Sequence, residues 1–209
     1  MLQAQINPHF LYNTLECIRG QAIADDELQI AETTHALSNY YRYNISNRRE
    51  IVSIKEELDN VQNYMKIQQY RFQGRFKMDI DYDCDERVLV DAVLPKLSLQ
   101  PLVENAIIHG FKHIMENAHI DISIVQSKKN LSIKVSDNGE GIDEETLMQI
   151  RKRLLQNSYD NHNPQEQHGI AMTNVNRRIV LLFGEQYGLT INSIKNAGTD
   201  IELHIPCTK

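Results

Sequence analysis

The chain has 209 residues, of which 41% are hydrophobic and 24% charged, and this is the composition of a soluble protein with one large or two small domains. Its formal net charge of −6 argues against non-specific nucleic-acid binding, and no apolar run is long enough to span a bilayer. Three widely spaced cysteines, Cys17, Cys84 and Cys207, favour reduced thiols over a disulfide framework or a zinc site.

The first stretch of interest surrounds His9. Asn7 is a good N-cap and Pro8 suits a first helical turn, so a helix that begins here places His9 and Asn13 on one face, a turn apart. A lone histidine on a helix is more often structural or merely exposed than catalytic. The residues by themselves leave both interpretations open.

Residues 1 to about 72 read as helix throughout, because Pro8 and Gly20 are the sole proline and glycine in that stretch. Asp25-Asp26 predicts a break and an N-cap before a second helix at about 27–45. Three amphipathic helices bury little apolar surface alone, so we expect them to pack on each other, on a second copy or on the following domain.

Ser53-x-x-Glu56 predicts the start of a third helix. The two residues form a capping box, in which each side chain accepts a hydrogen bond from the backbone N–H of the other. Gly74 is expected to end this helical half. We therefore divide the chain into a helical region, 1–73, and a second domain, 74–209.

From about residue 75 the apolar residues alternate, which indicates strands. The predicted strands are 77–83, 120–124, 131–135, 189–191 and 201–205. Three helices are expected between them, from Pro95 to about His109, at 144–155 and at 170–183. This grouping predicts an α+β fold, with helices on one face of a mixed or antiparallel sheet and a more polar opposite face.

The helix expected after Pro95 carries the first candidate binding residues of this half. Asn105 and His109 lie one turn apart on it, with Glu104 on the flank. The amide oxygen of Asn105 is a suitable ligand for Mg²⁺, which prefers oxygen and takes its remaining ligands from water and phosphates. A solvated polar helix face explains the same residues equally well.

Asp137-Asn138-Gly139-Glu140-Gly141 follows a predicted strand directly. An aspartate at a strand end can accept a hydrogen bond from an exocyclic amine, and two glycines let the backbone approach a planar ligand closely. A plain Asn-Gly turn is the alternative. Further on, the polar stretch 157–169 is expected to be a mobile lid or a surface insertion, and Gly169 beside a helix start would leave N–H groups facing a phosphate.

The order of these motifs is recognisable. LVENAIIHG, DNGEGI, HGIAMTNV and GTDIELHIP resemble the N-box, G1 box, G2 box and last strand of the GHKL nucleotide-binding fold. QINPHFLYNTL, combined with the downstream LQPLVENA, resembles the LytS/YesM-type sensor histidine kinases of two-component systems. The likeness covers essentially the whole chain. It implies a helical dimerisation and phosphoacceptor hairpin followed by a GHKL α/β-sandwich that binds ATP.

The resemblance implies roles for individual residues. His9 falls on the phosphoacceptor position, Asn13 on a position that orients water in dephosphorylation, and Glu104 on the acid before the N-box asparagine. Asn105 matches the Mg²⁺ ligand and Asp137 the partner of the adenine amine. The residues implied to bind ATP are Asn105, His109, Gly110, Lys112, Asp137, Gly139, Gly141, Ile142, Gly169, Asn174 and Thr199. Ala171 departs from the pattern, which has a second glycine there.

The implied activity is ATP-dependent autophosphorylation of His9 with Mg²⁺, followed by transfer to an aspartate of a response regulator receiver domain. The family further implies a homodimer and an upstream transmembrane sensor, so we expect a cytoplasmic fragment of a protein of the cell membrane. Two alternatives remain: a GHKL ATPase in which Glu104 activates water, and a non-catalytic nucleotide-binding dimer. No nucleic-acid partner is expected.

Overall fold

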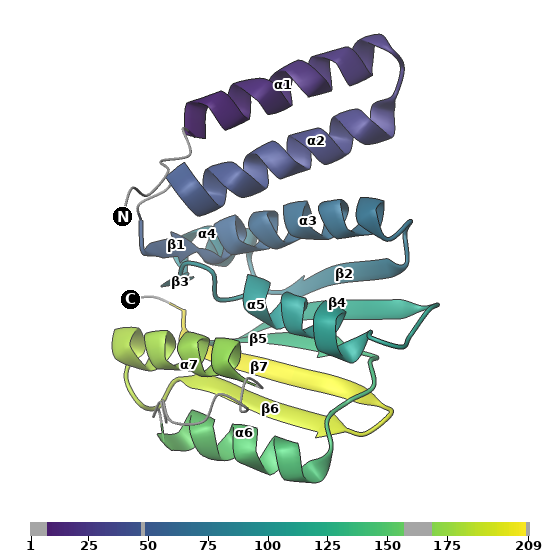
Figure 1. Cartoon of the computed structure of the whole chain (residues 1–209). Helices are drawn as coiled ribbons and strands as arrows, with labels where there is room; N and C mark the ends of the chain where they lie inside the picture. Colours follow the sequence, from purple (N-terminus) through teal and green to yellow (C-terminus); the bar gives the residue numbers. More distant parts are fainter. Residues whose placement is uncertain (1–7, 47–48, 157–168, 208–209) are drawn as a thin grey trace, which may run out of the picture. The chain divides into compact units, whose positions relative to one another are not determined.

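A computed structural model describes residues 8–46, 49–156 and 169–207 of the chain (Figure 1). The chain divides into two compact units, one formed by 1–49 with 59–74 and the other by 50–58 with 75–209. The helix α3, Ile54–Arg71, therefore begins in one unit and ends in the other. The predicted boundary after residue 73 remains a prediction.

The helical unit contains α1, Pro8–Ala24, packed along α2, Leu28–Tyr41, which continues into a π-helical turn, Arg42–Ser46 (Figure 1). The predicted break between α1 and α2 is confirmed. The predicted aspartate cap is wrong, because α2 begins after Glu27 and Asp25 instead accepts hydrogen bonds from Gln21 at 2.9 Å. The proposed cap at Asn7 lies outside the described residues.

The capping box at the start of α3 is confirmed. The Ser53 N–H donates to the Glu56 carboxylate at 2.9 Å, and the Glu56 N–H donates to the Ser53 hydroxyl at 3.2 Å. Gly74 ends this half as predicted, with a φ of 75° and an N–H that donates to Gln69 at 2.7 Å.

The prediction of helix throughout 1–72 is wrong in one place. Residues Ile51–Ser53 form a short strand, β1, which pairs antiparallel with β3, Val93–Pro95. Three β-branched or small residues make a weak local signal, and the partner strand lies some forty residues away, so local propensity does not reveal the pairing.

A five-stranded mixed sheet forms the centre of the second unit, in the order β2-β4-β5-β7-β6. Only the β2–β4 pair is parallel among these described strands. The strands are β2 Phe76–Asp83, β4 Ala118–Ser127, β5 Asn130–Asp137, β6 Gly188–Ile194 and β7 Gly198–Pro206. All five predicted strands are thus present, and each is longer than its alternating pattern, by one residue in β2 and by up to five in β4.

One face of this sheet is apolar and lies beneath the helices, and the other carries the alternate, polar residues, as predicted (Figure 1). The buried face includes Ile120, Ile122, Ile133, Leu203 and Ile205. The helical elements of this unit are α4 Glu86–Asp91, α5 Gln100–Asn105 with the π-helical turn η2 Ala106–Gly110, α6 Glu144–Gln156 and α7 Ile170–Phe183. The helix expected from Pro95 begins later, at Gln100, and α4 was not predicted.

Candidate functional site

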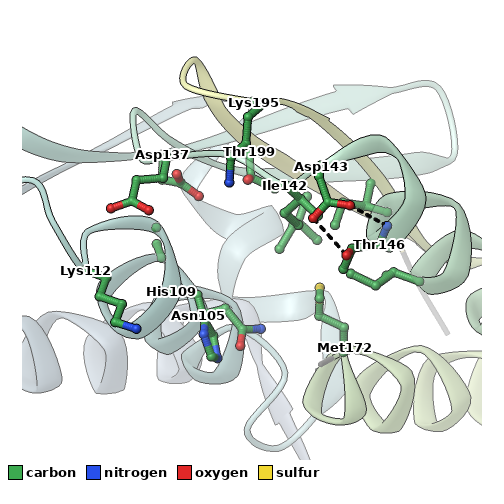
Figure 2. A pocket seen from close by; sticks show the side chains of 18 residues that line it. Asn105, His109, Lys112, Asp137, Ile142, Asp143, Thr146, Met172, Lys195 and Thr199 are labelled. Atoms are coloured by element: carbon green, nitrogen blue, oxygen red, sulfur yellow. Dashed lines mark hydrogen bonds between the residues drawn. The ribbon is translucent and has the colours of Figure 1, made fainter. Parts of the chain in front are cut away.

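A pocket of about 280 Å³ opens in the second unit between η2, the turn after β5, the start of α6 and the start of α7 (Figure 2). This volume is close to the lower end of the range of small-molecule sites, about 300–1,000 Å³. Nine of the eleven residues predicted to bind the cofactor line it. They are Asn105, His109, Gly110, Lys112, Asp137, Gly141, Ile142, Gly169 and Thr199.

Asp137 supplies the carboxylate of the pocket, from the last position of β5. Its Oδ1 accepts a hydrogen bond from the Gly139 N–H at 2.8 Å. Burial raises the pKa of Asp137 to about 6, although backbone N–H groups of Gly139 and Thr199 act in the opposite direction. The two backbone N–H groups thus offset only part of the cost of burying the Asp137 carboxylate.

Gly139 does not line the pocket, but it shapes the turn that holds Asp137. A Cβ at this position would lie 2.5 Å from the Asp137 carboxylate and 2.6 Å from the Gly110 Cα. The turn after β5 and the end of η2 therefore touch through backbone atoms, which only glycine permits here.

Gly141 has a φ of 60°, and a Cβ there would lie 2.0 Å from the carbonyl oxygen of Ile194. This close approach accompanies a hydrogen bond from the Asn196 N–H to the Glu140 carbonyl at 2.7 Å, which joins the β6–β7 turn to the turn after β5. The second conspicuous glycine of the motif is thus required by backbone geometry.

Asn105 lies at the end of α5, with its side chain facing the pocket (Figure 2). Its Nδ2 is buried and has no hydrogen-bond partner among the described residues. Rotation of an amide by 180° exchanges oxygen and nitrogen with little change of shape. The amide is therefore available to a ligand, and its oxygen fits the single protein ligand expected for Mg²⁺.

The remaining polar lining combines three basic side chains with the start of α6. Lys112, His109 and Lys195 bring basic groups to the pocket (Figure 2). At the start of α6, Asp143 accepts hydrogen bonds from the N–H and the hydroxyl of Thr146, both at 2.9 Å, and these bonds lower the pKa of Asp143.

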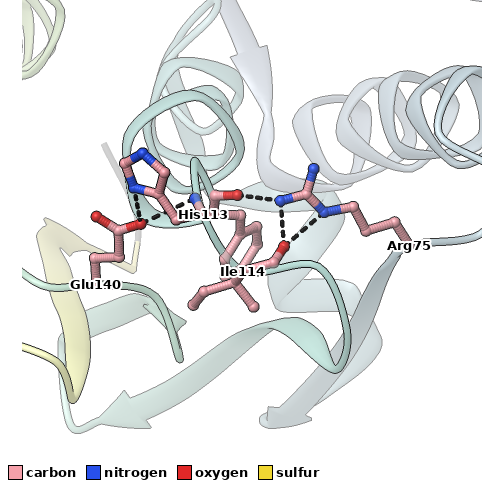
Figure 3. A network of polar contacts seen from close by, with 5 residues as sticks. Arg75, His113, Ile114 and Glu140 are labelled. Carbon is pink, nitrogen blue, oxygen red and sulfur yellow. Dashed lines mark hydrogen bonds and ion pairs between the residues drawn. The ribbon is translucent and has the colours of Figure 1, made fainter.

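The loop between η2 and β4 is held on two sides (Figure 3). Arg75 donates to the carbonyl groups of Phe111 and Ile114, and its Nε lies 2.6 Å from the Ile114 oxygen. The ring and backbone N–H of His113 contact the Glu140 carboxylate at 2.6 and 2.9 Å. Burial acts to raise the pKa of Glu140, but these contacts with His113 outweigh it and lower the pKa.

Several pocket residues were missed by sequence reasoning. They are Ala106, Glu140, Asp143, Thr146, Ile150, Met172, Ile191, Lys195 and Ile201. Glu140 lies inside DNGEGI and Met172 inside HGIAMTNV, so the motifs could have identified both. Asp143 and Thr146 have the spacing of a helix start, which could have identified them as well. The isoleucines of β6 and β7 resemble any core residue, and only the fold brings them to the pocket.

Among the residues predicted to be catalytic, His9 and Asn13 belong to the helical unit. Both are exposed on α1, and the Asn13 amide nitrogen lies 3.3 Å from the His9 Nδ1, which confirms that they share one face. Glu104 accepts a hydrogen bond from Gln100 at 2.7 Å and does not line the pocket.

Asn174 and Ala171 are exposed on α7 and do not line the pocket. The polar stretch 157–168, predicted as a lid, lies outside the described residues.

Comparison with protein families matches each half of the chain to a known family. The family described as histidine kinase-, DNA gyrase B- and HSP90-like ATPases matches residues 91–209, which include every residue of the pocket. The chain belongs to this ATPase family. The histidine kinase family matches residues 1–76 of the same ATPase-family chain, where His9 lies. The resemblance seen in the sequence motifs is confirmed, and the family assigns an ATP-binding domain to the second half.

The relatives of this ATPase-family chain include sensor kinases. It is 40% identical to the sensor histidine kinase YesM of Bacillus subtilis over 99% of its length, and 31% identical to the sensor protein LytS of Bacillus subtilis over 98%. A sensor protein LytS of Staphylococcus saprophyticus is 35% identical over 98%. The chain spans about a third (33%) of the length of each of these relatives.

Solved structures confirm the fold class. The catalytic domain of histidine kinase ThkA covers 76% of this ATPase-family chain, and 95% of itself, with a TM-score of 0.53 and 18% identity. The histidine kinase domain of a blue-light activated kinase from Erythrobacter litoralis covers 95% of the chain, and 96% of itself, with a TM-score of 0.50 and 14% identity. Within the described residues, no helix combines the length and apolar character needed to cross a membrane.

Proposed function

We propose that this chain is the kinase core of a two-component sensor histidine kinase, which phosphorylates His9 from ATP and Mg²⁺ and passes the phosphoryl group to a receiver-domain aspartate. The observation that carries the proposal is the combination of an exposed histidine in a histidine kinase region with an ATPase-family pocket built around Asp137. Neither half alone would distinguish a kinase from other nucleotide-binding proteins.

Adenine recognition rests on Asp137. Its carboxylate accepts the hydrogen bond of the exocyclic amine, while apolar side chains, including Met172, Ile142 and Ile191, contact the faces and edge of the ring. A buried acceptor left without its donor is costly, so this arrangement discriminates against rings that lack the amine at that position. Gly139 and Gly141 keep the backbone close enough for the ring to reach Asp137.

The phosphates would lie toward the polar side of the pocket, where Lys112 supplies positive charge, the His109 ring can donate an N–H, and Gly169 precedes the first turn of α7. Asn105 would hold Mg²⁺ through its amide oxygen, and that ion would supply charge neutralisation for the phosphates. The buried amide nitrogen of Asn105 has no hydrogen-bond partner among the described residues, which supports a side chain that completes its contacts with a ligand.

In the transfer step, the lone pair of an unprotonated ring nitrogen of His9 attacks the γ-phosphorus in line. The bond to the β–γ bridging oxygen breaks, its electrons leave with ADP, and the phosphorylated ring loses the proton on its other nitrogen to solvent. Imidazole suits this role because its neutral ring carries a lone pair on one nitrogen that can act as a nucleophile. The Asn13 amide nitrogen lies 3.3 Å from Nδ1, and a 180° rotation of this amide would let its oxygen accept from Nδ1–H and leave the lone pair on Nε2.

We further propose a homodimer formed through the helical region 1–73, a receiver domain as the phosphoryl acceptor, and an upstream membrane sensor in the whole protein. The relatives, of which this chain spans 33%, are named as sensors, which supports the presence of further regions. The ATPase alternative is less favoured, because Glu104 is bonded to Gln100 and lies outside the pocket lining.

The test is incubation with γ-labelled ATP and Mg²⁺ for the intact chain and for His9→Gln, with Asn39→Ala on α2 as the control. The proposal expects label that is lost in acid, survives alkali and disappears in His9→Gln alone. Release of phosphate without labelled protein, unchanged by His9→Gln, would instead establish an ATPase. ATP binding without either product would establish a nucleotide-binding module.

A further inference from the structure

Glu57, in the first turn of α3, is a charged side chain with 0% exposure that takes no part in the pocket. Its Oε1 accepts the N–H of Leu97 at 2.6 Å, and its Oε2 accepts the N–H groups of Ser98 and Leu99, both at 2.8 Å. All four residues belong to the compact unit that contains the pocket. A buried carboxylate is tolerated when hydrogen bonds replace its hydration, and here three backbone donors do so.

The segment that Glu57 holds has an unusual backbone. Leu97 has a φ of 59°, in the left-handed region that a branched side chain rarely adopts. Successive N–H groups converging on one anion form a nest, and Glu57 fills it. A strained residue persists only where its surroundings hold it, so the three bonds from Glu57 maintain this conformation.

Helix α7 also binds the 96–99 segment, through hydrogen bonds to its carbonyl groups. Arg178 donates to the carbonyl oxygens of Lys96 and Leu97, the latter at 2.7 Å. Helix α7 begins beside the pocket, where Gly169 and Met172 line the wall. The N–H groups of 97–99 are therefore bound to Glu57 on α3, and the carbonyl groups of Lys96 and Leu97 are bound to Arg178 on α7. The Lys96 N–H donates instead to the Glu50 carbonyl at 2.8 Å.

This segment leads directly into the helix that carries Asn105. The Leu99 carbonyl accepts the N–H groups of Leu102 and Val103 at 3.1 and 3.2 Å, and the Leu99 side chain gives α5 no cap. Glu57 thus fixes the N–H of Leu99, the residue directly before α5, and so holds the point at which the helix starts. Asn105 lies at the other end of this short helix, only six residues beyond Leu99.

We propose that Glu57 is a positioning residue of the nucleotide site, which sets the place of Asn105 by holding the 96–99 segment between α3 and Arg178. This inference rests on the proposed function, because the group that Asn105 positions is the metal–nucleotide complex. Glu57 touches neither, and its effect passes through the backbone that precedes α5.

The experiment compares Glu57→Gln with Glu56→Gln in the whole chain. A glutamine at 57 offers one acceptor oxygen to donors that now use two, so at least one N–H loses its partner. A glutamine at 56 removes the same charge one residue earlier but can still complete the capping box with Ser53. The measurements are the melting temperature, hydrogen exchange in peptides covering 97–110, and the KM for ATP and for Mg²⁺ in autophosphorylation.

Glu57→Gln is expected to speed exchange across 97–110 and to raise both KM values about tenfold or more, since small displacements of a positioning group cost up to about a hundredfold. Glu56→Gln should stay within about twofold. A purely structural role would lower the active fraction and hence kcat, with both KM values unchanged, and that result would overturn the proposal. So would unchanged exchange in folded Glu57→Gln.

If Glu57→Gln fails to fold, Arg178→Lys tests the contacts between α7 and the 96–99 segment. Lysine keeps the positive charge but lacks the planar guanidinium group that donates to two carbonyl oxygens at once. Arg178→Lys should raise the same KM values, and unchanged values would overturn the proposal. A wild-type chain that binds no nucleotide would refute the proposed function separately. Exchange in 97–110 would then still decide whether Glu57 holds α5.

Discussion

Replacement of Asp137 by asparagine should stabilise the nucleotide-free chain while it abolishes ATP binding. Burial raises the pKa of this carboxyl from 3.8 to about 6, so at neutral pH the folded state carries a charge that it disfavours. A shift of about two units corresponds to roughly 3 kcal/mol at about 1.4 kcal/mol per unit. The side chain is partly open to solvent, and screening reduces the expected gain to about 1 kcal/mol.

The pH dependence of this gain identifies its cause. Below the unfolded pKa near 4, Asp137 is protonated in both states and costs nothing. As pH rises toward 6 the unfolded chain ionises first, so the wild type loses stability, and above 6 the loss is complete. Asp137→Asn should therefore melt about 2–4 °C higher than wild type at pH 7.5, with the difference shrinking toward zero as pH falls to 4.

The assay is calorimetric melting at pH 7.5 and 4.5, with and without ATP, using the exposed strand residue Asp81→Asn as the control. ATP should raise the melting temperature of wild type and of Asp81→Asn, but not of Asp137→Asn, because a ligand stabilises only what it binds. A lower melting temperature for Asp137→Asn at pH 7.5, or a difference independent of pH, would refute the reasoning from burial. Stabilisation by ATP that survives in Asp137→Asn would refute the adenine contact.

Three further outcomes are expected. Wild-type affinity for ATP should weaken as pH falls below about 6, by up to tenfold per unit, since protonated Asp137 is a weaker acceptor for the amine than the carboxylate, and isothermal titration at pH 5 to 8 measures this. Gly141→Ala should abolish ATP binding and lower the melting temperature, whereas Gly20→Ala, whose Cβ meets nothing within 4 Å, should stabilise α1 by about 0.5–1 kcal/mol; equal effects would exclude the backbone contact at Gly141. Asn105→Ala should reduce autophosphorylation by about a hundredfold or more with little change in the binding of metal-free ADP, and an unchanged Mg²⁺ titration would remove Asn105 as the ligand.

The elements that could be predicted are those whose signal is local. Alternation identified the strands of the main sheet, and the Ser53 and Glu56 spacing identified the start of α3, because both depend on neighbouring residues. The pairing of Ile51–Ser53 with a strand forty residues away depends on tertiary structure and left no such signal.

The site divides in the same way. Asp137 and Asn105 stand in recognisable motifs, and both line the pocket. Ile191 and Lys195 reach it only because β6 joins the sheet beside β7, and nothing in their local sequence marks them. Glu57 resembles a surface acid on an amphipathic helix until the fold brings three backbone donors to it.

The register of the central sheet has a consequence for folding. The β4–β5 and β6–β7 hairpins close over short turns, but β5 and β7 pair across about sixty residues, and Asp137 and Thr199 are partners at the end of that ladder. Loop closure makes long-range pairing slow compared with hairpin formation. We therefore expect the edge of the pocket at Asp137 and Thr199 to form after the two hairpins, when β5 and β7 associate, so that a newly made chain has strands before it has a complete pocket.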